Sequence, residues 1–246
     1  MAAVEERICA DLTGVAGAAA NAIVRQVDRA YRRRGVCYLV LTGGPAAGAV
    51  YDILAHDRRH DVPWHRCHVF VSDDRFAPRA DRPGNAEFVN DRLLRHVGGA
   101  VLHRVPVDAR DAKAAADGYE REMRLVVPIG TEDTPVFDLI LLGLADGGRV
   151  AGLFPDTPAV DQSDRLVVAG GAAGSPADLV SITLTLINSA RCAVVAAAGN
   201  ASPSTYAAVR TDFRELPAHA RTPAGRVRPD GSVLWFVDVA TASGTR

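Results

Sequence analysis

The chain has 246 residues, a length that suits one domain with a substantial core. Its formal net charge of -1 gives no electrostatic basis for binding nucleic acid or an anionic membrane. The N-terminus lacks a basic stretch followed by an apolar one, and no apolar run approaches the roughly 18 residues of a membrane span. We therefore expect a single cytoplasmic domain over residues 1–246, with neither nucleic acid nor a membrane as a partner.

The cysteines give no sign of a metal site. Cys9, Cys37, Cys67 and Cys192 are scattered, without the C-x-x-C or Cys/His spacing that metal ligands usually show. We expect all four to be buried free thiols.

The first element is predicted to be a helix over residues 4–34, where apolar side chains recur at helical spacing. Three arginines at 32–34 and then Gly35 are typical of the end of a helix. The arginines could form an anion site, or they could be a solvated helix end that complements the helix dipole. The second interpretation is the more ordinary one.

A compact apolar strand is predicted over residues 36–42. It runs directly into Gly43 and Gly44, and a helix is predicted over residues 46–55. Strand, glycine turn and helix form the first half of a βαβ crossover. Two glycines alone are weak support for a phosphate-binding turn.

A second strand, predicted over residues 64–71, ends in a charged group. Asp73, Asp74 and Arg75 follow it directly. Two adjacent carboxylates and an arginine at the end of a strand could line a ligand site, or they could be a salt-bridged turn that caps the next segment. The composition does not decide between the two.

Strands and helices alternate through the rest of the chain. Helices are predicted over residues 86–94, 109–125 and 204–213, and strands over 101–105, 139–142, 165–169, 180–186, 192–198 and 232–240. Small residues at 170–176 predict a flexible linker. Alternation of this kind predicts an α/β fold with a doubly wound, largely parallel sheet flanked by helices on both faces.

The stretch over residues 137–155, FDLILLGLADGGRVAGLFP, is the best candidate for a ligand site. A buried strand ends at Gly143, and Gly147 and Gly148 allow the backbone to turn sharply and to approach a ligand. The residues after the glycines could open a helix or form a packed loop. In open α/β sheets, ligands bind at the carboxyl ends of the strands.

Five groups of residues, in this order, resemble the 6-phosphogluconolactonase family, which shares its fold with glucosamine-6-phosphate isomerases. The groups are Leu41-Thr42-Gly43-Gly44 with Tyr51, the run Asp73 to Pro78 with Asp81 and Asn85, the stretch 137–155, Leu216-Pro217-Ala218, and Trp235 with Asp238. The resemblance covers nearly the whole chain from about residue 36, and it implies a Rossmann-like domain of the sugar-phosphate isomerase and lactonase type.

The resemblance also implies a reaction. Such enzymes open the ring ester of 6-phosphogluconolactone without a metal or an organic cofactor. The histidine of a D-G-H triplet is thought to act as general base on the attacking water, and glycine-loop amides with an arginine and a lysine are expected to hold the phosphate.

This chain departs from the family pattern in that site. Without a gap, the D-G-H triplet falls on Gly147, Gly148 and Arg149, and an arginine keeps its proton at physiological pH. The phosphate-binding arginine and lysine correspond to Leu179 and Ser202.

We therefore expect a divergent member that acts on a sugar lactone or a related sugar, without a cofactor. The catalytic candidates are Asp73, Asp146 and Arg149, and the substrate-binding candidates are Gly43, Gly44, Asp74, Arg75, Asn85, Gly147 and Gly148. A carboxylate would be the acid or base, and Arg149 the partner of an anion or oxyanion. Two alternatives stay open: a non-catalytic binding module or partner of a sugar-pathway enzyme, and an ordinary 6-phosphogluconolactonase with compensating residues elsewhere.

Overall fold

The computed structural model describes residues 3–76, 83–130, 133–171, 178–199, 201–213, 220 and 222–243. A seven-stranded sheet forms its centre. The strands are β1 (Ala3–Cys9), β2 (Cys37–Leu41), β3 (Cys67–Val71), β5 (Val101–Leu102), β6 (Leu139–Gly143), β9 (Cys192–Ala197) and β10 (Ser232–Asp238). Every neighbouring pair in it is parallel, in the order β1-β10-β9-β6-β2-β3-β5. The predicted α/β fold class is confirmed.

The strand order reverses between β2 and β6. From β2 the chain proceeds to β3 and β5 on one side, whereas β6 leads to β9 and β10 on the other. Helices that follow the two strands leave in opposite directions at such a point, and a crevice opens at the carboxyl ends of the strands.

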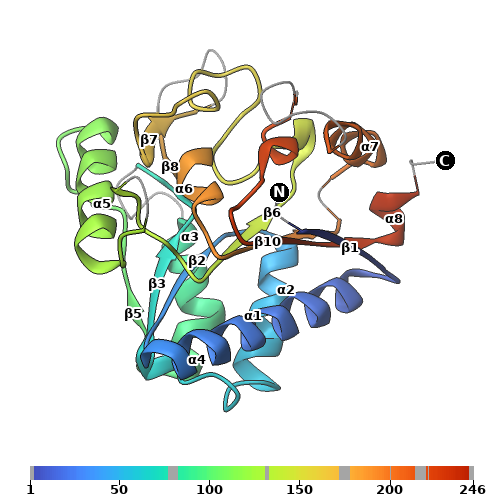
Figure 1. Ribbon diagram of the computed structural model, residues 1–246, viewed down its shortest axis with the longest axis horizontal. Coiled ribbons are helices and arrows are strands. Elements are labelled where there is room, and N and C mark those ends of the chain that lie inside the picture. Colours follow the sequence, from blue (N-terminus) through green and yellow to red (C-terminus); the bar gives the residue numbers. More distant parts are fainter. Residues whose placement is uncertain are drawn as a thin grey trace.

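Helices cover both faces of the central sheet (Figure 1). Helices α1 (Leu12–Arg34) and α2 (Pro45–His56) pack together on one face, while α5 (Ala112–Val126) and α6 (Leu184–Asn188) lie on the other. The remaining helices are α3 (Asn85–Val89), α4 (Arg95–Val97), α7 (Pro203–Asp212) and α8 (Val239–Ala242). Within the described residues, no helix is long and apolar enough to cross a membrane.

A second, three-stranded sheet was not predicted. It is antiparallel, with β8 (Leu179–Ile182) between β4 (Asp73–Arg75) and β7 (Val167–Gly170). Because β4 follows β3 after the single residue Ser72, the second sheet begins at the carboxyl edge of the first. This places Asp73 above the ends of the parallel strands.

The prediction of one helix over residues 4–34 was wrong in its first part. Residues 3–9 form the edge strand β1, and the side chain of Asp11 then caps α1 by accepting the N–H of Gly14 at 2.8 Å. A four-residue spacing such as that of Val4 and Ile8 fits one face of a helix and equally one face of a strand, so pairing with β10 decided the outcome.

Two other boundaries differ from prediction because caps intervene. The strand expected over 180–186 ends at Ile182, where Thr183 caps α6, and the last strand ends at Asp238, which caps α8. The helix expected over 86–94 is α3 followed by a π-helical turn, Asn90–Leu94. Residues 64–66 form a 3-10 turn before β3. All four cysteines are buried and free, as predicted.

Some sequence predictions lie outside the described residues. These are Ala77, Pro78 and Asp81, most of the linker at 170–176, and the Leu216-Pro217-Ala218 group.

Candidate active site

A cavity of about 200 Å³ lies at the crevice between β2 and β6. The segments that follow these two strands supply most of its wall, and β4 and α3 close it. It is lined by Thr42, Gly43, Gly44, Asp73, Asn85, Gly143, Leu144, Ala145, Arg149 and Ala151. The fold therefore places a polar cavity where ligands bind in open α/β sheets.

The turn after β2 is held in place from the helix that follows it. The hydroxyl of Tyr51 accepts the N–H of Thr42 at 3.0 Å and donates to the Thr42 carbonyl at 2.6 Å. Gly44 adopts φ 103°, a conformation that favours glycine, and Pro45 then opens α2. A Cβ on Gly43 would lie 2.0 Å from Oδ1 of Asn85, so any larger residue here would displace Asn85 from its place on the cavity wall.

Asp73 is a buried carboxylate on the cavity wall. The hydroxyl of Ser72 lies 2.6 Å from its Oδ1 and 2.9 Å from Oγ1 of Thr42. Burial raises the pKa of Asp73, and the hydrogen bond from Ser72 and the positive charge of Arg149 oppose that rise. The result is a carboxylate that is more basic than a solvated one.

Its neighbour Asp74 holds the start of α3. The Asp74 carboxylate accepts the N–H groups of Arg75 at 2.9 Å, Asn85 at 2.8 Å and Ala86 at 3.1 Å. The two interpretations of the acidic pair therefore apply to different residues: Asp74 caps the next segment, and Asp73 faces the cavity.

Arg149 reaches the cavity from the loop after β6. A short 3-10 helix, Asp146–Gly148, contains two glycines with positive φ, 72° at Gly147 and 75° at Gly148. The Arg149 guanidinium donates to the Ala151 carbonyl at 3.2 Å and stacks 4.8 Å from the centre of the Phe154 ring. The segment 149–154 is thus a packed loop rather than a helix, and it fixes a cation beside the cavity.

The predicted site residues are only partly brought together. Gly43, Gly44, Asp73, Asn85 and Arg149 line the cavity. Asp74, Arg75, Asp146, Gly147 and Gly148 do not line it.

Two of the residues outside the cavity still have defined positions. The exposed Asp146 accepts the N–H of Ser202 at 3.4 Å, which ties the glycine loop to the start of α7. Arg75 pairs across the antiparallel sheet with Leu179, so the two side chains emerge on the same face.

No histidine lies among the described residues that line the cavity. His68 and His103 form a separate chain, in which His68 Nδ1 lies 2.9 Å from His103 Nε2 and His103 Nδ1 lies 2.6 Å from a carboxylate oxygen of Glu122. Within the described residues, no group of three or more His, Cys, Asp or Glu is placed to hold a metal ion.

Five lining residues were not among the individual site candidates: Thr42, Gly143, Leu144, Ala145 and Ala151. The last four lie within the stretch 137–155, which was predicted as a whole to be the ligand site, and Thr42 directly follows β2. The sequence did not show which residues of that stretch reach the cavity, because this depends on how the packed loop folds back.

Comparison with known proteins identifies the family. Residues 10–235 match the model of the family described as glucosamine-6-phosphate isomerases/6-phosphogluconolactonase. The chain belongs to this family.

Several proteins of the glucosamine-6-phosphate isomerase/6-phosphogluconolactonase family resemble the chain along most of its length. A 6-phosphogluconolactonase of Synechocystis sp. is 32% identical over 91% of each chain. One from Streptomyces coelicolor is 31% identical, over 93% of this chain and 90% of its own. In fold, the crystal structure of 6-phosphogluconolactonase from Leishmania guyanensis has a TM-score of 0.82 and 24% identity over 99% of both chains.

Proposed function

We propose that this protein is a hydrolase that opens the ring ester of a sugar lactone. One observation carries the proposal: the buried carboxylate of Asp73 and the guanidinium of Arg149 line the same small cavity at the switch point of the sheet. The similarity to proteins named 6-phosphogluconolactonase supports lactone hydrolysis as the class of reaction.

In the proposed reaction, Asp73 is the general base. Its carboxylate takes a proton from a water molecule as the water oxygen attacks the lactone carbonyl carbon. Negative charge develops on the carbonyl oxygen, and Arg149 stabilises it. The bond between the carbonyl carbon and the ring oxygen then breaks, the ring oxygen takes the proton back from Asp73, and a hydroxy acid is released.

The pKa of Asp73 suits this role. A general base works best when its pKa approaches the operating pH, and burial shifts the pKa of Asp73 in that direction. Arginine keeps its proton, so Arg149 can stabilise an anion but cannot be the base.

The remaining site candidates are proposed to bind or to position. Gly43, Gly44 and Asn85 would contact substrate hydroxyls from the cavity wall. Asp74 would position α3 and thereby Asn85. Four candidates do not line the cavity and would shape the loop and the rim around Arg149: Arg75, Asp146, Gly147 and Gly148.

An unphosphorylated sugar lactone is the proposed substrate. Arg149 is the one cation among the described residues that line the cavity. The family's phosphate-binding positions hold Leu179 and Ser202, and the Ser202 hydroxyl is engaged in capping α7, where it accepts the N–H of Thr205 at 3.2 Å. Loss of two charge-assisted hydrogen bonds of about 1.5–3 kcal/mol each would weaken the binding of a phosphorylated sugar by orders of magnitude.

A second candidate is hydrolysis of 6-phosphogluconolactone itself. Its support is the name that the similar proteins carry, together with the place of Arg75 beside Leu179, where a cation could reach a phosphate. A cytoplasmic location and a protein partner stay predictions of the sequence.

The test is the opening of freshly prepared lactones, followed as acid release in a pH-stat. Glucono-δ-lactone should open faster than its spontaneous rate, and the phosphorylated lactone should not be preferred. Arg149→Ala should remove most of the acceleration, whereas Arg32→Ala, an exposed arginine paired with Asp28, should leave the rate unchanged. A preference of more than about tenfold for the phosphorylated lactone would establish the second candidate. No acceleration with any lactone would favour a non-catalytic binding protein.

A further inference from the structure

A second pocket of about 430 Å³ lies beyond the opposite ends of the strands of the central sheet. Its wall includes the last turns of α1 and the residues just before β6, β9 and β10, which are the amino ends of those strands. The candidate active site lies at the carboxyl ends of the strands, so the sheet separates the two cavities. The charged residues of the wall are Arg29, Arg33, Arg34, Asp138, Arg191 and Asp230.

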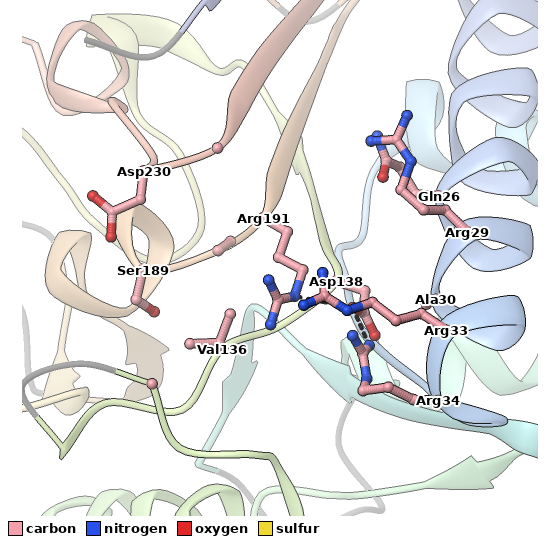
Figure 2. A pocket seen from close by; sticks show the side chains of 13 residues that line it. Gln26, Arg29, Ala30, Arg33, Arg34, Val136, Asp138, Ser189, Arg191 and Asp230 are labelled. Carbon is pink, nitrogen blue, oxygen red and sulfur yellow. Dashed lines mark hydrogen bonds and ion pairs between the residues drawn. The ribbon is translucent and has the colours of Figure 1, made fainter.

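Arginines from distant parts of the chain converge in this pocket (Figure 2). Arg33 and Arg34 come from the end of α1, and Arg191 comes from the turn before β9. Their guanidinium groups gather around Asp138, while Arg29 lies on the same face of α1 one turn earlier. Solvation of a helix end explains charges on α1 alone, and it does not explain a guanidinium brought to the same place from residue 191.

Asp138 organises the cluster. Its buried carboxylate pairs with Arg34, lies 3.6 Å from Nε of Arg191, and accepts the N–H of Tyr38 at 3.0 Å. The side chain of Asp138 is only 3% exposed, whereas that of Arg191 is 44% exposed. Asp138 thus holds Arg34 and Arg191 in place from the buried side of the pocket. Part of each arginine side chain stays exposed at the pocket surface.

Positive charge in the pocket exceeds what its own carboxylates neutralise. Four guanidinium groups face two carboxylates, those of Asp138 and Asp230. Arg29 and Arg33 form no ion pair with any carboxylate in the described part of the chain. In addition, Nε of Arg34 is buried and has no hydrogen-bond acceptor among the described residues. A surplus of about two positive charges matches a dianionic ligand.

We propose that this arginine pocket is a second, non-catalytic binding site for a phosphorylated small molecule. The planar guanidinium fork donates two parallel hydrogen bonds to phosphate oxygens, which makes clustered arginines suited to a phosphoryl dianion. The volume is in the range of pockets that enclose small organic ligands. Polar groups of Gln26 and Ser189 also border the pocket and could contact the organic part of the ligand.

Calorimetric titration with three probes tests the proposal: inorganic phosphate, pyrophosphate and glucose 6-phosphate. All titrations use one ionic strength set with sodium chloride, because screening weakens exposed charge interactions. We expect saturable binding by the wild-type protein. Arg33→Ser and Arg191→Ser should each weaken it about tenfold or more, since each removes a charge-assisted hydrogen bond. Both arginines are solvent-exposed, so these variants should keep the fold, which a thermal melt verifies.

Two control variants make the test specific. Arg32→Ser removes a neighbouring exposed arginine that is paired with Asp28 and does not line the pocket, and it should bind as the wild type does. Arg149→Ser removes the cation of the candidate active site and should also leave binding intact. The proposal is overturned if no probe binds saturably below about 10 mM, a threshold that corresponds to roughly 3 kcal/mol of binding free energy. It is equally overturned if Arg32→Ser costs as much affinity as Arg33→Ser, or if binding is lost in Arg149→Ser and kept in Arg33→Ser.

Discussion

At the scale of single residues, the neighbours Asp73 and Asp74 show how backbone hydrogen bonds separate two identical side chains. Asp74 is held by three backbone N–H groups, whereas Asp73 is buried at the wall of the cavity and its pKa is raised. The sequence located this pair and named both residues as candidates. It could not tell their roles apart, because the N–H groups that hold Asp74 belong partly to α3, more than ten residues along the chain.

The raised pKa of Asp73 predicts that the wild-type residue lowers stability at neutral pH. A carboxyl group whose folded-state pKa lies above its unfolded value of about 3.9 destabilises the fold once it ionises, so this cost grows as pH rises through the folded pKa and vanishes in acid. Asp73→Asn should therefore raise the melting temperature at pH 7, and the gain should shrink toward pH 4. Asp28→Asn, which removes an exposed carboxylate of α1, should change stability by less than about 0.5 kcal/mol at either pH. A melting temperature for Asp73→Asn below that of the wild type at pH 7 would contradict the conclusion that Asp73 lowers stability when it is ionised.

Arg149 illustrates what a sequence can and cannot predict at a site. Its position in the glycine loop marked it as a candidate, and its place on the cavity wall depends on contacts with Ala151 and Phe154 within the same loop. Asp146 and Gly147 belong to the same glycine loop and lie only two or three positions before Arg149. They are nevertheless exposed and do not line the cavity. A short turn can place residues that are adjacent in sequence on different sides of a loop. The periodicity of the sequence gives no information about which of them will face the cavity.

At the scale of elements, the strands of the parallel sheet were the most predictable part of the fold. Buried parallel strands are continuous apolar runs, as in β2, β6 and β9, and such runs are readily recognised. The edge strand β1 was mistaken for helix because its apolar spacing fits both periods. The antiparallel sheet was missed because β4 has only the three charged residues Asp73, Asp74 and Arg75.

The junction of β4 and α3 should be sensitive to a single methyl group. A Cβ on Gly84 would lie 1.9 Å from Oδ1 of Asp74, the oxygen that accepts N–H groups of Arg75 and Asn85. Gly84→Ala should therefore lower the free energy of unfolding by about 1–3 kcal/mol, measured by urea denaturation.

Gly17→Ala is the matched control for this prediction. Gly17 lies within α1, and apart from its chain neighbours and the adjoining helix backbone no atom lies within 4 Å of the place where its Cβ would be. Alanine should raise stability there by about 0.5–1 kcal/mol, because glycine is the poorer helix former. Equal stability of Gly84→Ala and the wild type would show that Asp74 does not need its present position.

At the scale of the whole molecule, the parallel sheet places the two cavities at opposite ends of its strands, and the reversal of strand order between β2 and β6 accounts for the one at the carboxyl ends. The candidate active site lies at the carboxyl ends of β2 and β6, and the amino ends of β6, β9 and β10 border the arginine pocket. The sequence patterns did not predict the order of the strands. Pairings such as β1 with β10 join residues that are more than 200 positions apart, and no local pattern encodes them.

Hydrogen exchange should be slowest in the central strands of the parallel sheet. The amides of β6 and β9 lie inside the sheet with almost every residue buried, whereas β5 is a two-residue edge strand whose Val101 is 47% exposed. We expect β6 and β9 to exchange only through global unfolding and β5 to exchange through local opening. Faster exchange in β9 than in β5, measured by mass spectrometry, would contradict this order.

The central claim, that Asp73 is the base in lactone opening, is tested most directly by the turnover of Asp73→Asn. Asparagine keeps the shape of the side chain and cannot accept the proton of the attacking water. With a lactone that the wild-type protein opens, kcat should fall by about 100-fold or more, the usual contribution of a general base, and KM should change little. A variant whose kcat stays within about threefold of the wild-type value would contradict the claim, because general-base catalysis cannot survive the loss of its base so nearly intact.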